Sequence, residues 1–228
     1  MQVDTAQRLP IFEVVTPAAN AAARRLTTAT KVQTMLGIGT TDTTLIEQLI
    51  DFVSANAVRY CGLARPVSGT NVPTFGSETV RATFMQSLEW RGTRLILPWR
   101  TPITSISSVT EDGITLTVNT DYKLVEGNML ERFLNDAPTY WSTAKVIVNY
   151  VAGWSLPDGV PAEIEGAVIE QVKYQYLSRD RDQSLRSENV PDVYAATYSV
   201  PGGDAISKNG LMTALENALS AFKDWSAV

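Results

Sequence analysis

The hydrophobic pattern changes its period twice along the chain, and this change limits the folds open to it. Apolar residues recur at helical spacing in residues 27–61 and again in residues 161–178, whereas residues 79–152 mostly alternate apolar and polar side chains. A period of two places apolar side chains on one face of a strand, not of a helix. We therefore expect an α+β fold: a mainly helical bundle, made of an αα-hairpin and C-terminal helices, with an inserted antiparallel β meander.

Residues 27–61 are predicted to form two helices. Thr44 and Glu47 have the spacing of a capping box, in which each side chain accepts a hydrogen bond from the other residue's backbone N–H, so we expect the second helix to begin there. Its apolar stripe contains Leu45, Ile46, Leu49, Ile50, Val53, Ala57 and Tyr60. For the first helix, the candidate N-caps are Thr27 and Thr28, and the candidate ends are Gly37 and Gly39.

The middle of the chain is predicted to be a series of short antiparallel strands. We expect them at residues 80–90, 94–97, 103–111, 115–118, 122–125 and 145–151. Asp112-Gly113 lies between two of these segments and is typical of a tight hairpin turn, because both residue types tolerate positive φ. Glu126-Gly127-Asn128 indicates another turn.

The two ends of the chain differ from the main domain, which is expected at residues 26–178. Residues 1–25 are predicted to be an extended N-terminal arm, in which Leu9–Pro17 is a short strand or an arm, because its two prolines disfavour a helix. Residues 179–228 are predicted to be a polar loop or arm followed by a C-terminal helix.

Composition removes several classes of chemistry. The chain has no histidine, so it cannot contain a Ser-His-Asp or Cys-His triad or a histidine-ligated zinc. Its one cysteine, Cys61, ends an apolar stripe and is expected to be a small buried hydrophobe. Glu163, Glu165 and Glu170 are expected to be solvated helix charges and not a catalytic pair. We predict that the chain is not an enzyme and has no catalytic residues, cofactor or metal site.

Charge and hydropathy also indicate where such a chain is found. The net charge of −5 argues against a protein that grips nucleic acid through its phosphates. No apolar run reaches the roughly 20 residues that span a bilayer. The first residues lack the basic start and apolar core of a secretion signal. We therefore expect that the protein is made and kept in a cytoplasm and that it makes no contact with a membrane.

Five aromatic or basic residues are candidate partner contacts. Tryptophan and arginine are over-represented at interface hot spots. Trp99 and Arg100 belong to a cluster with Trp90, Arg91 and Arg94, for which the alternative is tryptophan packing in the β core with arginines at its edge. Tyr194 and Tyr198 lie in a segment that is either an arm ordered by a neighbour or a mobile loop. The fifth candidate is Trp225, close to the C-terminus.

The order of these segments resembles the head-to-tail connector family of siphophages and gene transfer agents, also called head completion or adaptor proteins. The resemblance covers residues 9–178. The stretches that carry it are Glu13–Ala19 with Leu26–Ile38, then Val58–Gly62, then Leu97–Val109, Asp112-Gly113, Asp121-Tyr122 and Val146–Trp154, followed by Val160–Ile164.

The resemblance implies a structural role. It implies a subunit of a ring of about twelve copies that docks on the portal protein, extends the DNA channel and receives stopper or tail proteins. DNA would pass through without sequence-specific binding, and the protein would lie at the head–tail interface of the virion. Another virion or tail-assembly protein, of the tail-completion or stopper type, is the alternative.

Overall fold

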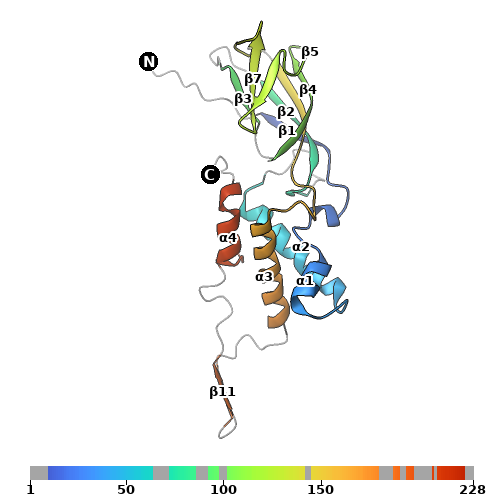
Figure 1. The fold of residues 1–228 in the computed structure, drawn as a ribbon, viewed down its shortest axis with the longest axis vertical. Helices are drawn as coiled ribbons and strands as arrows, with labels where there is room; N and C mark the ends of the chain where they lie inside the picture. Colours follow the sequence, from blue (N-terminus) through green and yellow to red (C-terminus); the bar gives the residue numbers. More distant parts are fainter. Residues whose placement is uncertain are drawn as a thin grey trace, which may run out of the picture. The chain divides into compact units, whose positions relative to one another are not determined.

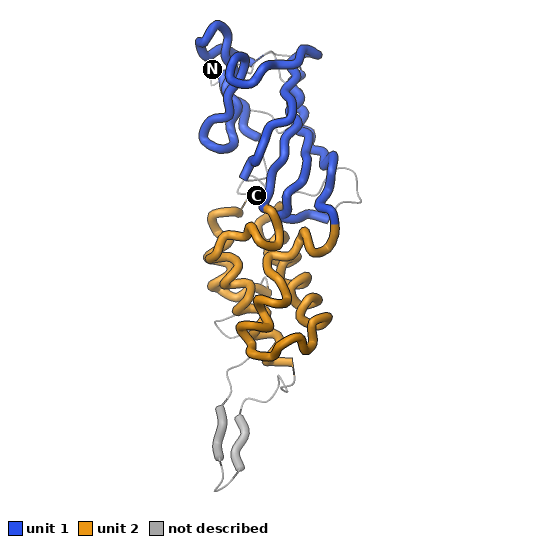
Figure 2. The backbone as a smooth tube through the Cα atoms, turned by 45° about the vertical axis from the view of Figure 1, so that its right-hand side comes forward, with its two compact units in different colours: residues 1–19, 64–154 blue, residues 20–63, 155–228 orange. Residues whose placement is uncertain are grey.

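The chain forms two compact units, each assembled from segments that are distant in the sequence. The computed structural model describes residues 10–63, 72–85, 92–97, 102–141, 145–179, 187–190, 194–197, 207 and 210–223. Unit 1 contains residues 1–19 and 64–154, and unit 2 contains residues 20–63 and 155–228 (Figure 2). The chain therefore leaves unit 2 after residue 63 and returns to it at residue 155.

The strands of unit 1 form two antiparallel sheets (Figure 1). The larger sheet has the order β1 (Ile11–Thr16), β2 (Glu78–Met85), β9 (Lys145–Ala152), β4 (Ile103–Glu111) and β5 (Ile114–Leu116). The smaller sheet has the order β3 (Arg94–Ile96), β7 (Met129–Leu134) and β6 (Tyr122–Val125), and β8 (Ala137–Pro138) pairs with β7. The segment that the sequence left as strand or arm is thus an edge strand, β1.

The two sheets bury their apolar faces in one core. Every second residue of β2 and β9 is buried, as the period of two predicts. The core includes side chains from both sheets, among them Phe84, Val148 and Tyr150 of the larger sheet and Leu95 and Leu130 of the smaller one. Burial of this apolar surface is the main force that holds the sheets together.

Tight turns fix the register of both sheets. Asp112 and Gly113 have φ of 49° and 86°, and Glu126 and Gly127 have φ of 51° and 77°. Positive φ at both central residues is the geometry whose twist matches that of the flanking antiparallel strands. These turns join β4 to β5 and β6 to β7, at the two places where the sequence predicted them.

An ion pair with little exposure links the two sheets of unit 1. The side chains of Arg132 in β7 and Glu111 in β4 are 13% and 12% exposed, and Arg132 Nε donates to Glu111 Oε2 at 2.9 Å. Arg132 Nη1 also donates to the carbonyls of Asp121, at 2.8 Å, and Phe133. Because its donors satisfy both a carboxylate and backbone acceptors, this arginine offsets the cost of burying its charge.

Residues 75–77 and 153–154 hold the two ends of the inserted part of unit 1 side by side. The rings of Phe75 and Trp154 stack with centroids 4.9 Å apart. Trp154 N–H donates to the Phe75 carbonyl at 2.7 Å, and Ser77 N–H donates to the Trp154 carbonyl at 2.8 Å. Gly153 has φ of 107°, and a Cβ there would lie 2.3 Å from the Gly76 carbonyl oxygen. Only glycine fits this position.

The described residues of unit 2 form four α-helices: α1 (Ala29–Leu36), α2 (Thr43–Tyr60), α3 (Ala162–Ser178) and α4 (Thr213–Leu219). Short 3₁₀ turns lie at Ala22–Arg24 and Ser220–Phe222. Both α1 and α4 contact α2 and α3, which also contact each other. A two-stranded hairpin, β10 (Ser187–Val190) and β11 (Tyr194–Thr197), follows α3.

One helix start was predicted correctly and another was not. The Thr28 side chain accepts a hydrogen bond from Lys31 N–H at 3.3 Å, and Gly37 ends α1 with φ of 71°. The capping box at Thr44 and Glu47 is wrong, because α2 already begins at Thr43 and no side chain caps it. Glu47 instead pairs with Arg25 at 2.9 Å, a distant partner that sequence spacing does not reveal.

The predicted fold class is also wrong, because it gives helices too large a share of the chain. The chain is not a mainly helical bundle with an inserted meander, since helices and strands take comparable shares of it and the strands build a unit with its own core. Turn signals located most strands, but they did not reveal that β3, β6 and β7 form a second sheet. That sheet exists because its apolar face has the larger sheet to pack against.

We predict that Arg132→Ala destabilises the protein by about 3–5 kcal/mol, because it leaves Glu111 buried without this partner. The matched control is Arg94→Ala, which removes the ion pairs with Glu126 and Glu131 of an arginine that is 45% exposed. It should cost much less stability, because solvent screens exposed ion pairs. Urea unfolding of both variants measures the two losses. Equal losses would contradict the role given to Arg132.

We predict that Gly153→Ala is more destabilising than Gly113→Ala. Both glycines have positive φ, which costs an alanine about 1–3 kcal/mol. A Cβ at Gly113 would meet no atom within 4 Å, whereas at Gly153 it would overlap backbone. The difference between the two unfolding free energies therefore measures the overlap, and no difference would show that the contact is absent.

Candidate interaction surfaces

Among the described residues, no group of three or more histidine, cysteine or acidic side chains is placed to hold a metal ion. Cys61 is buried, and burial raises the pKa of its thiol to about 12, so it stays protonated and unreactive at neutral pH. Its Sγ lies 3.7 Å from the Leu219 carbonyl oxygen, within the packing of α2 against α4.

A helix that crosses a lipid bilayer needs about 20 consecutive, predominantly apolar residues. No helix in the described part of the chain combines the necessary length with the necessary apolar character.

Most of the predicted partner contacts lie outside the described residues. These are Trp99, Arg100, Tyr198 and Trp225, together with the neighbouring Trp90 and Arg91. Tyr194 begins β11, where its backbone pairs with Val190 of β10. Arg94 is described, and it forms surface ion pairs with Glu126 and Glu131 at 3.2 and 3.1 Å.

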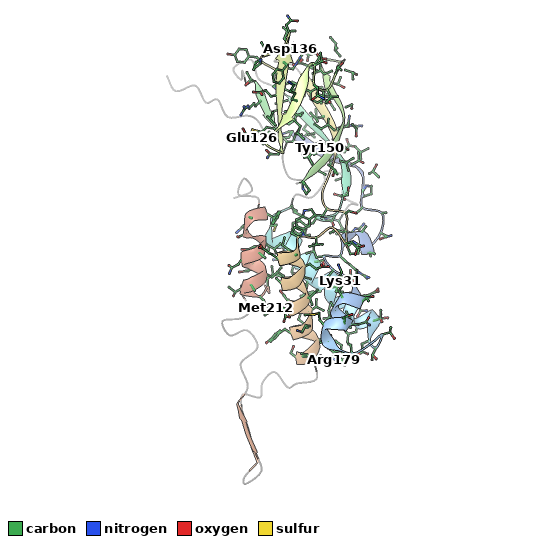
Figure 3. All side chains as sticks on the ribbon, in the orientation of Figure 1. Lys31, Glu126, Asp136, Tyr150, Arg179 and Met212 are labelled. Carbon is green, nitrogen blue, oxygen red and sulfur yellow. The ribbon has the colours of Figure 1, made fainter. Side chains whose placement is uncertain are left out.

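A polar cluster joins the C-terminal end of α3 to the residue before α2. Tyr176 Oη donates to Asp42 Oδ2 at 2.7 Å, and Arg179 Nη1 donates to the same oxygen at 3.0 Å. The Arg179 guanidinium lies over the Tyr176 ring, 4.1 Å from its centroid; Figure 3 labels Arg179 at this end of α3. We name these three residues the α3 clamp. It fixes α3 at the point where the polar stretch 179–209 begins.

The α3 clamp changes the titration of its members. The hydroxyl of Tyr176, and after it the guanidinium of Arg179, lowers the pKa of the Asp42 carboxyl. The same hydrogen bond raises the pKa of the Tyr176 hydroxyl, which therefore remains a donor. Because the folded pKa of Asp42 is depressed, its contribution to stability is present above the pKa of the unfolded chain and is lost as pH falls through the folded pKa.

A second polar contact joins α1 to α3. Lys31 Nζ lies 2.7 Å from Glu165 Oε1, and Thr27 Oγ1 donates to the same oxygen at 3.2 Å. Glu165 is 19% exposed, so its interpretation as a solvated helix charge was wrong. Glu170 pairs at the surface with Lys173, and Glu163 is exposed.

A polar ladder crosses the outer face of the larger sheet. Arg81 in β2 donates to Glu13 of β1 at 3.2 Å and to Asn149 of β9 at 3.1 Å. Asn149 Nδ2 donates in turn to Ser108 Oγ of β4 at 2.9 Å. These residues stand opposite one another in the sheet register. Cross-strand pairs of this kind set the register of a sheet and keep this face hydrophilic.

Sequence reasoning missed the α3 clamp and the polar ladder. The members of each come from segments that are far apart in the sequence. In the α3 clamp, Asp42 lies just before α2, whereas Tyr176 and Arg179 lie at the end of α3. The ladder carries a weak signal, because Arg81 and Asn149 both occupy polar positions of alternating segments. Which strand pairs with which was not readable from that alternation.

Solved chains from gene transfer agent particles are among those similar to this one in structure. A chain from the neck of an empty gene transfer agent particle is 15% identical, with a TM-score of 0.49, over 91% of this chain and 94% of that chain. A chain from the neck of the native particle is 14% identical, with a TM-score of 0.45, over 79% and 88%. A chain from the virion of the native particle is 15% identical, with a TM-score of 0.46, over 79% and 89%.

These particles are gene transfer agents, which the sequence resemblance also named. At such identities and TM-scores the likeness does not assign a function. No protein-family model matches the chain, and no curated protein matches it.

We predict that Tyr176→Phe raises the pKa of Asp42 toward the ordinary value of an aspartate. The substitution removes the hydrogen bond from the Tyr176 hydroxyl, which is the largest cause of the lowered pKa. Tyr174→Phe, two residues earlier on α3, is the matched control and should leave that pKa unchanged. An NMR titration of the Asp42 carboxyl carbon measures both. An unaltered pKa in Tyr176→Phe would show that the hydrogen bond does not form.

Proposed function

We propose that this chain is a non-enzymatic structural subunit of the head-to-tail connector of a tailed phage or gene transfer agent. The observation that carries the proposal is the ordered resemblance across residues 9–178, from Glu13–Ala19 through Leu97–Val109 to Val146–Trp154 and the helix opened by Val160–Ile164. In this role the chain forms a ring on the portal protein, receives stopper or tail proteins and is located in the virion.

The described surfaces support a scaffolding role. Each unit has its own buried core, and polar contacts such as the α3 clamp and the Arg132–Glu111 pair hold segments that are distant in the sequence. Side chains with large apolar surface stay exposed on both units, among them Ile114 and Leu134 on unit 1 and Phe52 and Leu177 on unit 2. Surface of this kind is buried when subunits assemble.

The charge of the chain suits a channel through which DNA must slide. A net charge of −5, repeated around a ring, gives a field that repels phosphates within about a Debye length, roughly 8–10 Å. A basic lining would hold DNA through counterion release. The channel wall in this proposal is therefore not basic, and DNA makes no sequence-specific contact with it.

A tail-completion or stopper protein is the second candidate. Such a protein would also be a non-enzymatic virion component, but it would bind the assembled connector and not the bare portal. The order of binding therefore separates the two candidates.

Electron microscopy of the purified chain mixed with its cognate portal tests the proposal. We expect a collar of about twelve copies on the portal, with an acidic or neutral channel wall. A chain that binds only after another ring has assembled supports the second candidate. If the chain associates with neither, both are wrong.

A further inference from the structure

Gly166 lies on the exposed face of α3, where no contact among the described residues requires a glycine. A Cβ at this position would meet no atom within 4 Å, and its φ is not in the positive range. Glycine in a helix interior is less stable than alanine, because it loses more conformational freedom on folding. A glycine at such a position permits the close approach of another chain.

The residues around Gly166 form a site for one inserted side chain. Gly166, Ile169, Glu170 and Lys173 have the spacing i, i+3, i+4 and i+7, which is that of the four residues that surround a hole in knobs-into-holes packing. All four are exposed or half-buried. The missing side chain at Gly166 makes this hole deeper than the other holes of the face.

Phe52 is a matching knob on the opposite side of unit 2. It is 55% exposed, on a face of α2 where its exposed neighbours Gln48, Asp51 and Ala55 are polar or small. The buried faces of α2 and α3 contain Ile50 and Val53 on one helix and Val168 on the other, and the two helices contact each other. Their exposed faces therefore point away from each other.

Phe52 on α2 and the hole beside Gly166 on α3 lie at equal distances from the α3 clamp, measured along the helices. Asp42, just before α2, bonds Tyr176 at the end of α3, so the two helices run antiparallel. Phe52 lies ten residues after Asp42, and Gly166 lies ten residues before Tyr176. At 1.5 Å per residue both are ~15 Å from the clamp. A rotation about an axis along the helices keeps this level, as in a closed ring.

A positive charge on α2 and a negative charge on α3 lie beyond Phe52 and Gly166, farther from the α3 clamp. Arg59 is exposed in the last turn of α2, and Glu163 is exposed in the first turn of α3. Neither has an ion-pair partner among the described residues. They lie 17 residues from Asp42 and 13 residues from Tyr176, so their levels differ by only ~6 Å. Long side chains can close this distance.

We propose that the exposed face of α2 in one copy packs on the exposed face of α3 in the next copy, with Phe52 inserted beside Gly166 and Arg59 paired with Glu163. The two faces are different surfaces on opposite sides of unit 2, so the contact is head-to-tail, the type of contact that forms a ring when the rotation between neighbouring copies closes. The inference rests on the proposed function, which supplies the ring, and identifies the faces that build it.

Three variants test this contact on the full chain with its cognate portal. Gly166→Leu fills the hole, and Arg59→Glu places two acidic groups together. Each should lower ring formation about tenfold or more. Arg59→Glu combined with Glu163→Arg should restore it, because the swapped charges pair again. Ala214→Leu is the control for added bulk, since Ala214 is a small exposed residue of α4 outside the proposed contact.

A thermal measurement separates assembly from folding. Gly166→Ala should raise the Tm of the unassembled chain by about 2 °C, because alanine favours the helix. If wild type forms no ring on the portal, the proposed function fails. If wild type forms a ring and Gly166→Leu and Arg59→Glu assemble as well as Ala214→Leu, the ring stands and the proposed contact is wrong. A double variant as defective as Arg59→Glu alone would also contradict the proposed charge pair.

Discussion

The closure of unit 1 at residues 75–77 and 153–154 is the constraint on which the two-unit architecture depends. The chain leaves unit 2 after residue 63 and returns at residue 155, so the inserted part must begin and end at one place. The stack of Phe75 on Trp154 and the hydrogen bonds of Trp154 N–H and Ser77 N–H hold its two ends together. Gly153 allows the backbones to approach closely enough for these contacts.

Within each unit, polar groups fix geometry that apolar burial leaves open. Burial drives the two sheets of unit 1 together, but it is non-directional. The Arg132–Glu111 pair and the ladder through Arg81 require particular strands to be opposite each other. In unit 2 the α3 clamp does the same for α2 and α3. Units whose elements are fixed in this way can present defined surfaces to a neighbouring copy.

The α3 clamp gives the exposed faces of α2 and α3 a common explanation. A helix glycine with open space beside it, an exposed phenylalanine and two complementary charges are each ordinary when seen alone. The antiparallel arrangement that the α3 clamp fixes sets Phe52 and Gly166 at equal distances from it. The proposed ring would use surfaces that the fold of one subunit has already aligned.

The sequence by itself determined the local structure of this protein, and the tertiary structure decided how the pieces combine. Helix α1 with its Thr28 cap and the turn at Asp112-Gly113 follow from residue spacing, because their stabilising contacts lie within a few residues. The strands β4 and β9 follow from residue alternation, although their pairing partners are distant in the sequence. The second sheet, the partner of Glu47 and the α3 clamp depend on residues far apart in the chain. Alternation predicts that a strand has a buried face, but only the folded chain determines what covers it.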